Sequence, residues 1–235
     1  FYLIIPVLLY SCSRKNKSEF YLPAEWEPQA GVIVNGLDDT ATFEMVTQLT
    51  KEMKVFCLLT DSSTDMYKKK LAAAGVNPDS IQFITSSTEF SYAQRDGVLF
   101  LKNGKGEKKL VNFAWNMYGW YFDTTIKDYI EKDKVKRKLY TDLHLKAFPY
   151  AVVSSAMVNE GGAIETNGKG TILQVESVNM QRNPGMSKEL QEAELKKVLN
   201  AKKIIWLKEG AAEDPFGWGT LITANYFGIG VKGHL

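Results

Sequence analysis

Three short polar motifs carry the residue types that could do chemistry. They are Arg95-Asp96, Asn159-Glu160-Gly161-Gly162 and Gly233-His234, and they supply carboxylates and an imidazole, which can hold cations or transfer protons. Each motif stands at or beside the end of an expected strand, where α/β folds usually place functional residues. Each also has an ordinary interpretation: a surface salt bridge, a turn, and a solvated or core histidine.

Metal chemistry is not indicated by the amino-acid counts. The chain has two cysteines, Cys12 and Cys57, and two histidines, His144 and His234. These are too few for a disulfide scaffold, a cysteine-rich zinc site or a histidine cluster. His144 falls in a polar, amphipathic stretch, so we expect a structural or surface role for it.

The composition is that of an ordinary globular protein. The chain has 235 residues, of which 45% are hydrophobic and 24% charged, and its formal net charge is +2. This balance excludes disordered, collagen-like and coiled-coil proteins. It also argues against a nucleic-acid partner, because no basic surplus is available to neutralise phosphates.

The hydrophobic pattern predicts alternating strands and helices. The expected strands cover residues 30–35, 55–60, 81–85, 97–102, 108–114, 150–155, 163–167, 171–175 and 202–208, and the expected helices cover residues 40–54, 65–74, 124–144 and 187–199. Asp39 or Thr40 is a candidate N-cap, and Gly75 suits a left-handed C-terminal position. Glycine-containing turns at 103–106 and 168–170 predict two hairpins.

The order of elements repeats near residues 97–155 and 161–208 as a hairpin, a helix and a strand. Such units bury their faces only against neighbours, so they stack or close on themselves. Periodicity alone indicates an α/β domain and no more.

The N-terminal end resembles an export signal. The apolar run of residues 1–10 is too short to span a bilayer, which takes about 20 residues, but it suits the apolar region of a partial signal segment. Leu9-Tyr10-Ser11-Cys12 resembles the lipobox of bacterial lipoproteins. We therefore expect a signal segment over residues 1–12, lipid attachment at Cys12 and a polar tether over residues 13–20. A buried strand is the alternative.

Taken together, the motifs resemble those of the agmatine deiminase and bacterial-type peptidylarginine deiminase family, within the guanidine-modifying superfamily. The residues that carry the resemblance are Leu22 to Gln29, Gln94-Arg95-Asp96, Glu160-Gly161-Gly162, residues 168–173, Arg182-Asn183-Pro184, residues 204–207 with Gly210, and Gly233-His234-Leu235, which is similar to the start of a Gly-His-x-Asp motif. The resemblance implies a five-bladed α/β propeller. Residues 21–235 would form a partial deiminase domain with about three of the five blades, truncated at the C-terminus.

The resemblance also implies a reaction. A guanidinium group would be hydrolysed to a ureido group with release of ammonia, through a cysteine nucleophile in the missing C-terminal part. Asp96 would bind the guanidinium, His234 would act as general acid and base, and Glu160 would orient that imidazole and raise its pKa. No metal or organic cofactor is implied.

The partners implied are a small-molecule or peptide guanidinium substrate and, through the lipid anchor alone, a membrane. Agmatine, which would place the reaction in putrescine biosynthesis, and peptidyl-arginine both remain open as substrates. The expected location is the bacterial cell envelope, lipid-anchored or periplasmic.

Two features depart from the family pattern. Val34 to Asp39 stands where the family commonly has a Trp-Pro pair, and Gly97-Val98 stands where it has Gly-Pro. Neither Cys12 nor Cys57 suits the nucleophile, so we expect this chain alone to be inactive. Two alternatives stay open: a guanidinium-binding lipoprotein that has lost its chemistry, and a surface-anchored α/β domain whose motifs are structural.

Overall fold

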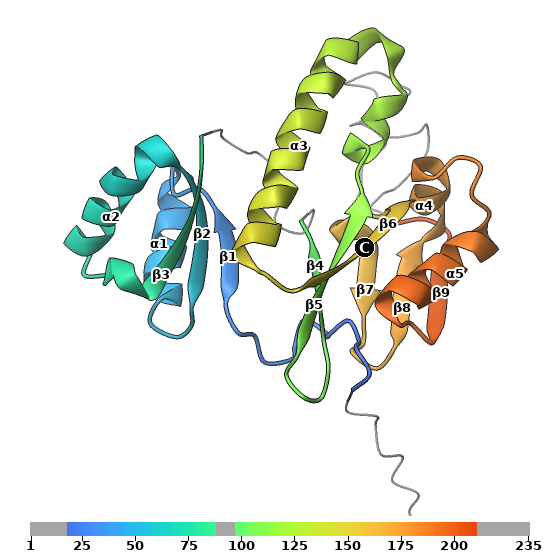
Figure 1. Ribbon diagram of the computed structural model, residues 1–235, viewed down its shortest axis with the longest axis horizontal. Coiled ribbons are helices and arrows are strands. Elements are labelled where there is room, and N and C mark those ends of the chain that lie inside the picture. Colours follow the sequence, from blue (N-terminus) through green and yellow to red (C-terminus); the bar gives the residue numbers. More distant parts are fainter. Residues whose placement is uncertain (1–17, 88–96, 211–235) are drawn as a thin grey trace, which may run out of the picture.

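The computed structural model describes residues 18–87 and 97–210. In this part of the chain the strands form three separate sheets of three strands each, in the orders β1-β2-β3, β4-β5-β6 and β7-β8-β9. Figure 1 shows the sheets side by side in chain order, with the second sheet between the first and the third. The expected α/β class is confirmed.

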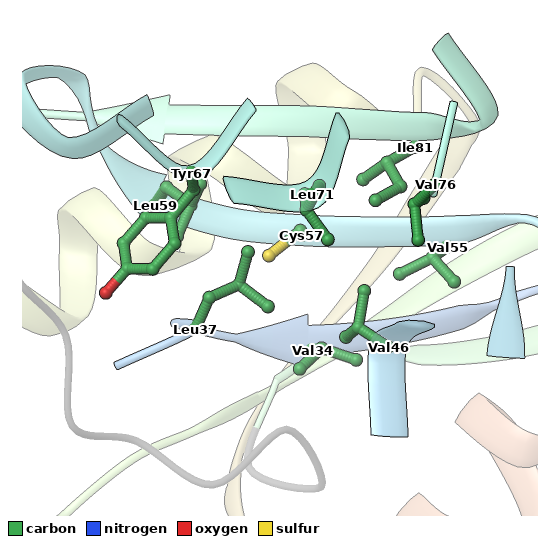
Figure 2. Close-up of a cluster of buried hydrophobic side chains, with 10 residues drawn as sticks. All are labelled: Val34, Leu37, Val46, Val55, Cys57, Leu59, Tyr67, Leu71, Val76 and Ile81. Atoms are coloured by element: carbon green, nitrogen blue, oxygen red, sulfur yellow. The ribbon is translucent and has the colours of Figure 1, made fainter. Parts of the chain in front are cut away.

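The first sheet is entirely parallel. Its strands are β1 (Val32–Asn35), β2 (Val55–Thr60) and β3 (Ile81–Ser86), and they are connected by α1 (Thr40–Leu49) and α2 (Thr64–Ala73). Strand β2 is apolar along most of its length because both of its faces are covered. Cys57 faces a cluster formed with α1 and α2 (Figure 2), whereas Leu58 packs in a second cluster with residues of α3.

The ends of the two helices follow local rules. The side chain of Asp39 accepts a hydrogen bond from Thr42 N at 2.8 Å and caps α1. Gly75 has φ +81° just after α2, a conformation that glycine adopts without strain. The prediction that α1 reaches residue 54 is wrong, since the helix ends at Leu49 and Met53 lies in the turn that leads into β2.

The second and third sheets share one plan. Each is an antiparallel hairpin followed, after a helical crossover, by a parallel strand. The second contains β4 (Leu99–Lys102), β5 (Lys108–Ala114) and β6 (Ala151–Val158), and the third contains β7 (Ile164–Thr166), β8 (Thr171–Val175) and β9 (Lys203–Leu207). Both predicted hairpins and the repeat are confirmed.

The crossover helices differ between the two units. The long helix α3 (Lys127–Ala147) connects β5 to β6, and α4 (Glu176–Arg182) with α5 (Lys188–Leu199) connects β8 to β9. Helix α5 packs against β6, and its Leu195 and Leu199 join a cluster with Val111 and Ile172. The second and third sheets therefore share a core.

The segment before β1 joins two hairpins. Tyr21 pairs with Lys102 at the end of β4 through two main-chain hydrogen bonds of 2.9 and 3.0 Å. The carboxylate of Glu27 lies 2.9 Å from Lys102 Nζ and accepts a hydrogen bond from Ala24 N at 3.0 Å. Gly168 has φ +66°, and a Cβ atom there would lie 2.2 Å from Glu27 Oε1 and 3.0 Å from Ala24 N, so this position favours glycine. The stretch Leu22 to Gln29, which carries part of the family resemblance, thus has a packing role.

His144 lies in the interior, near the end of α3. Only 2% of its surface is exposed, and its ring centroid lies 4.4 Å from that of Tyr140. Nδ1 lies 2.8 Å from the main-chain oxygen of Tyr140, so Nδ1 carries the proton and donates. Burial lowers the pKa of His144 from its ordinary value of 6.5. The hydrogen bond to Tyr140 raises this pKa and the positive charge of Arg137 lowers it, but burial has the largest effect. Of the two roles expected for His144, the structural one is confirmed.

The depressed pKa of His144 predicts a loss of stability in mild acid. Below pH 6.5 the unfolded chain takes up a proton that the folded chain resists, so the free energy of unfolding falls as the pH falls towards the folded pKa. The loss can reach about 1.4 kcal/mol per pH unit from one group. Urea unfolding at pH 7 and pH 5 should show a smaller loss in His144→Gln than in the native chain. Equal losses in the two proteins would contradict this assignment.

Candidate active site

Glu160 lies at the edge of the second sheet where its parallel strands end. Strands β5 and β6 run parallel and end there, and β4 begins there because it is antiparallel to β5. Gly97-Val98, which directly follow Asp96 in the chain, precede β4, and Glu160 follows β6. We call the side on which β1, β2, β3, β5 and β6 end the carboxyl edge. Figure 1 shows the arrows of β1 and β5 pointing to the same side.

Most of the expected site residues lie outside the described part of the chain. Asp96, His234 and Cys12 all fall there, so their roles stay predictions. Glu160 is described, and its surroundings can be tested against the expectations.

Glu160 is a buried, paired carboxylate. Only 2% of the residue is exposed, and its Oε1 atom accepts a hydrogen bond from Nε of Arg182, which is 4% exposed. Gly161 and Gly162 do form the turn that the sequence indicates, a short 3₁₀ helix closed by a 3.0 Å bond from Ala163 N to Glu160 O. The carboxylate nevertheless points into the protein, where a charge requires a partner.

Asn183 fixes the end of β6. Its Oδ1 atom accepts a hydrogen bond from Val158 N at 2.8 Å, and its Nδ2 atom donates to Val158 O at 2.9 Å. The amide thus binds the strand as a neighbouring main chain would. Because Val158 lies two residues before Glu160, this contact limits where the carboxylate can lie.

A left-handed turn follows β5 at the same edge. Met117, Tyr118 and Gly119 have φ values of 54°, 55° and 92°, a conformation that costs free energy for residues other than glycine and persists where surrounding contacts enforce it. Asn116 supplies such contacts. Its Oδ1 atom accepts from Gly119 N at 3.0 Å, and its Nδ2 atom donates to the main-chain oxygen of Arg182 at 3.1 Å.

A cavity of about 150 Å³ lies at the carboxyl edge of the first sheet. Asn35, Thr60 and Ser86, the last residues of β1, β2 and β3, line it together with Asp38. Asp38 accepts a 2.5 Å hydrogen bond from the hydroxyl of Tyr67, which raises the pKa of Tyr67 to about 12. The segment Val34 to Asp39, which departs from the family pattern, thus borders a polar cavity that contains a carboxylate.

Cys57 is not suited to nucleophilic attack. It is fully buried, and Figure 2 shows its sulfur beside Leu37 and Leu71. Burial raises the pKa of this thiol to about 12, with a further contribution from the charge of Asp38. At neutral pH the group is a protonated thiol, whereas the thiolate is the reactive form. This agrees with the sequence interpretation.

Three residues that hold the candidate site in place are not identified by residue type alone. They are Arg182, Asn183 and Asn116. The first two belong to a stretch that carried the family resemblance, yet nothing in their spacing points to Glu160. Within residues 18–87 and 97–210 no three His, Cys, Asp or Glu residues gather as metal ligands would. No helix described there has the length and apolar character needed to cross a membrane.

Comparison with known proteins agrees with the motifs. The family described as Porphyromonas-type peptidyl-arginine deiminase matches residues 21–217. The agmatine deiminase of Ectopseudomonas mendocina is 26% identical over 208 residues, which cover 83% of this chain and 54% of that protein. The chain spans 54% to 60% of the length of the curated relatives it matches.

Solved structures of agmatine deiminases share the fold. That of Enterococcus faecalis gives a TM-score of 0.63 at 22% identity, over 92% of this chain and 56% of the other. That of C. jejuni gives 0.61 at 17% identity, over 83% and 58%. The match over residues 21–217 establishes that this chain belongs to the Porphyromonas-type peptidyl-arginine deiminase family.

Proposed function

We propose that the protein is a hydrolase that converts a guanidinium group to a ureido group, with the described residues forming the N-terminal part of its active site. The observation that carries the proposal is the burial of Glu160 at the carboxyl edge, just after β6 ends, in a chain of this family. A five-bladed propeller, of which the three sheets would be blades, belongs to the same proposal.

The reaction needs a carbon made electrophilic and a nucleophile held over it. Asp96 pairs with the N–H edge of the planar cation and offsets the cost of removing it from water. A cysteine thiolate beyond residue 235 attacks the central carbon and forms a C–S bond. His234 protonates the departing nitrogen, the C–N bond breaks and ammonia leaves.

Water completes the turnover. His234, now neutral, removes a proton from water, whose oxygen attacks the same carbon while the C–S bond breaks. The oxygen loses its second proton to solvent and stays in the ureido product as the carbonyl oxygen, and the thiolate is regenerated. Glu160 orients the imidazole through these steps, as a carboxylate does beside a catalytic histidine. The balance requires no oxidant, reductant or metal.

The cavity beside Asp38 supports agmatine as the preferred substrate. Agmatine carries a primary ammonium at the end opposite its guanidinium, and a carboxylate lining a polar cavity complements such a cation. The described residues form no salt bridge to Asp38 within 4.0 Å. Peptidyl-arginine is the alternative substrate. It would need a wide entrance to the active site and contacts to the main chain of the peptide.

The complete gene product tests this proposal through its ureido product. With agmatine or an arginine peptide as substrate, Asp96→Asn should abolish turnover, because the guanidinium loses its ionic partner. Glu160→Gln should lower kcat by about 100-fold or more, the range of general acid–base effects. The folded fraction of each variant is measured by circular dichroism, and activity is expressed per folded protein. This correction is needed because Glu160→Gln also removes the partner of Arg182.

Glu176→Gln is the matched control. Glu176 is a partly exposed carboxylate at the start of α4 that pairs with Lys188 at 2.5 Å and has no role in the proposed chemistry. Its substitution should leave kcat unchanged. Near-native turnover in Asp96→Asn would refute the role given to Asp96, and near-native turnover in folded Glu160→Gln would refute that of Glu160.

The second candidate function is guanidinium binding without chemistry. It is favoured by the state of Cys57, the only cysteine in the part of the chain that the structure describes, which is a buried thiol. A lipoprotein with this function would bind agmatine and release no ammonia. Calorimetric binding to a complete protein that makes no ureido product would select it.

Cys57 should be dispensable for turnover. Because the thiol is buried and protonated, it should react with an aromatic disulfide reagent at pH 8 only after unfolding. Cys57→Ala should retain the kcat of the parent. Rapid labelling of Cys57 in the folded protein, or loss of kcat in folded Cys57→Ala, would show that the thiol takes part in the reaction.

We also propose the cell envelope as the location, supported by the apolar run of residues 1–10 and the lipobox-like Cys12. Cys12→Ser removes the thiol that would carry the lipid, and it should shift the protein from the membrane fraction to the soluble fraction of cells. Mass spectrometry of the native N-terminus would find an acylated Cys12. An unmodified Cys12 in the mature protein would contradict the anchor.

A further inference from the structure

We propose that Arg182 is a positioning residue of the reaction, which holds the carboxylate of Glu160 at the carboxyl edge. The guanidinium is 4% exposed and the carboxylate 1%, and Nε of Arg182 donates to Oε1 of Glu160. The inference rests on the proposed function, in which Glu160 orients a catalytic imidazole.

Stability alone does not account for such a pair. Taking two charges out of water is costly, and well-packed apolar side chains in their place are often as stable or more so. Removing one partner is strongly destabilising, because the other charge is then buried without compensation. The fold therefore retains a buried ion pair whose two charges must both be present. We attribute its presence to function, because the proposed reaction needs a carboxylate held in one position.

Arg182 is itself held from two neighbouring elements. Its main-chain oxygen accepts the 3.1 Å hydrogen bond from Asn116, which follows β5, and the next residue, Asn183, binds both main-chain groups of Val158 in β6. Its Nη1 atom donates to Gln181. The guanidinium thus approaches Glu160 from a backbone fixed against β5 and β6.

Lysine cannot reproduce this contact. In arginine the donor Nε stands one bond closer to the backbone than the Nζ of lysine, and Nη1 makes a second bond that lysine lacks. Arg182→Lys keeps the positive charge and so preserves compensation of the buried carboxylate. It moves the donor, and with it the carboxylate, which makes it the informative variant.

The placement also affects how Glu160 acts on the histidine. A guanidinium in contact with the carboxylate opposes its negative charge, so the carboxylate can raise the pKa of a nearby imidazole less than an unpaired one would. Orientation is then the main effect of Glu160. This changes the balance between the two roles that the sequence implied.

The experiment uses the complete gene product with agmatine and four variants. These are Arg182→Lys, Glu160→Gln, the double variant with both changes, and Lys188→Met as the control, which removes the half-exposed lysine that pairs with Glu176. A misplacement of about 1 Å can cost up to 100-fold in rate. Arg182→Lys should lower kcat by about 10-fold to 100-fold, with KM within about threefold of the parent and a similar unfolding midpoint. Lys188→Met should keep the parent kcat.

The double variant separates positioning from a general structural role. If Arg182 acts through Glu160, Arg182→Lys should have little further effect once Glu160 is Gln, so the losses are not additive. A structural role predicts multiplied losses. Should Arg182→Lys fail to fold, the variant Glu160→Gln with Arg182→Gln removes both charges, and it should fold with the kcat of Glu160→Gln.

The possible failures are distinguishable. Parent-like kcat in Arg182→Lys, or losses that multiply in the double variant, would overturn the inference and leave the proposed function standing. Absence of ureido product from the unsubstituted protein would overturn the proposed function and this inference with it.

Discussion

The contact between Glu160 and Arg182 is the interaction on which the candidate site depends. Neither charge can stay buried without the other, so β6, which places the carboxylate, and α4, which places the guanidinium, are committed to one relative position. Asn183 and Asn116 enforce the same position through main-chain groups of Val158, Gly119 and Arg182. The second and third sheets therefore meet at a polar junction as well as along their shared apolar core.

The topology explains why chemistry is expected on one side of the molecule. Parallel strands end together, and the antiparallel β4 begins where β5 ends. The polar cavity at the first sheet and Glu160 at the second lie at ends of parallel strands. Apolar clusters occupy the space between the sheets, and the polar groups of the candidate site lie at the ends of the strands.

Much of the fold could be predicted because it depends on local signals. The apolar run of β2, the glycine turns of both hairpins, the Asp39 cap and Gly75 all act within a few residues. The end of α1 could not be predicted from apolar spacing, since Met53 continues the pattern into a turn. Apolar spacing does not predict the short helix α4 either. Glu160 and Arg182 are 22 residues apart, and their contact depends on how α4 packs beside β6, which no local pattern encodes.

We propose that Asp96, Glu160 and one imidazole meet at a single site, and the most direct measurement of this is a structure of the complete protein with agmatine bound. We expect a hydrogen bond of about 2.6 to 3.2 Å between the Glu160 carboxylate and a ring nitrogen of His234, with Asp96 paired to the guanidinium of the substrate. Side chains of Glu160 and His234 in separate surroundings, with no cleft in common, would contradict it.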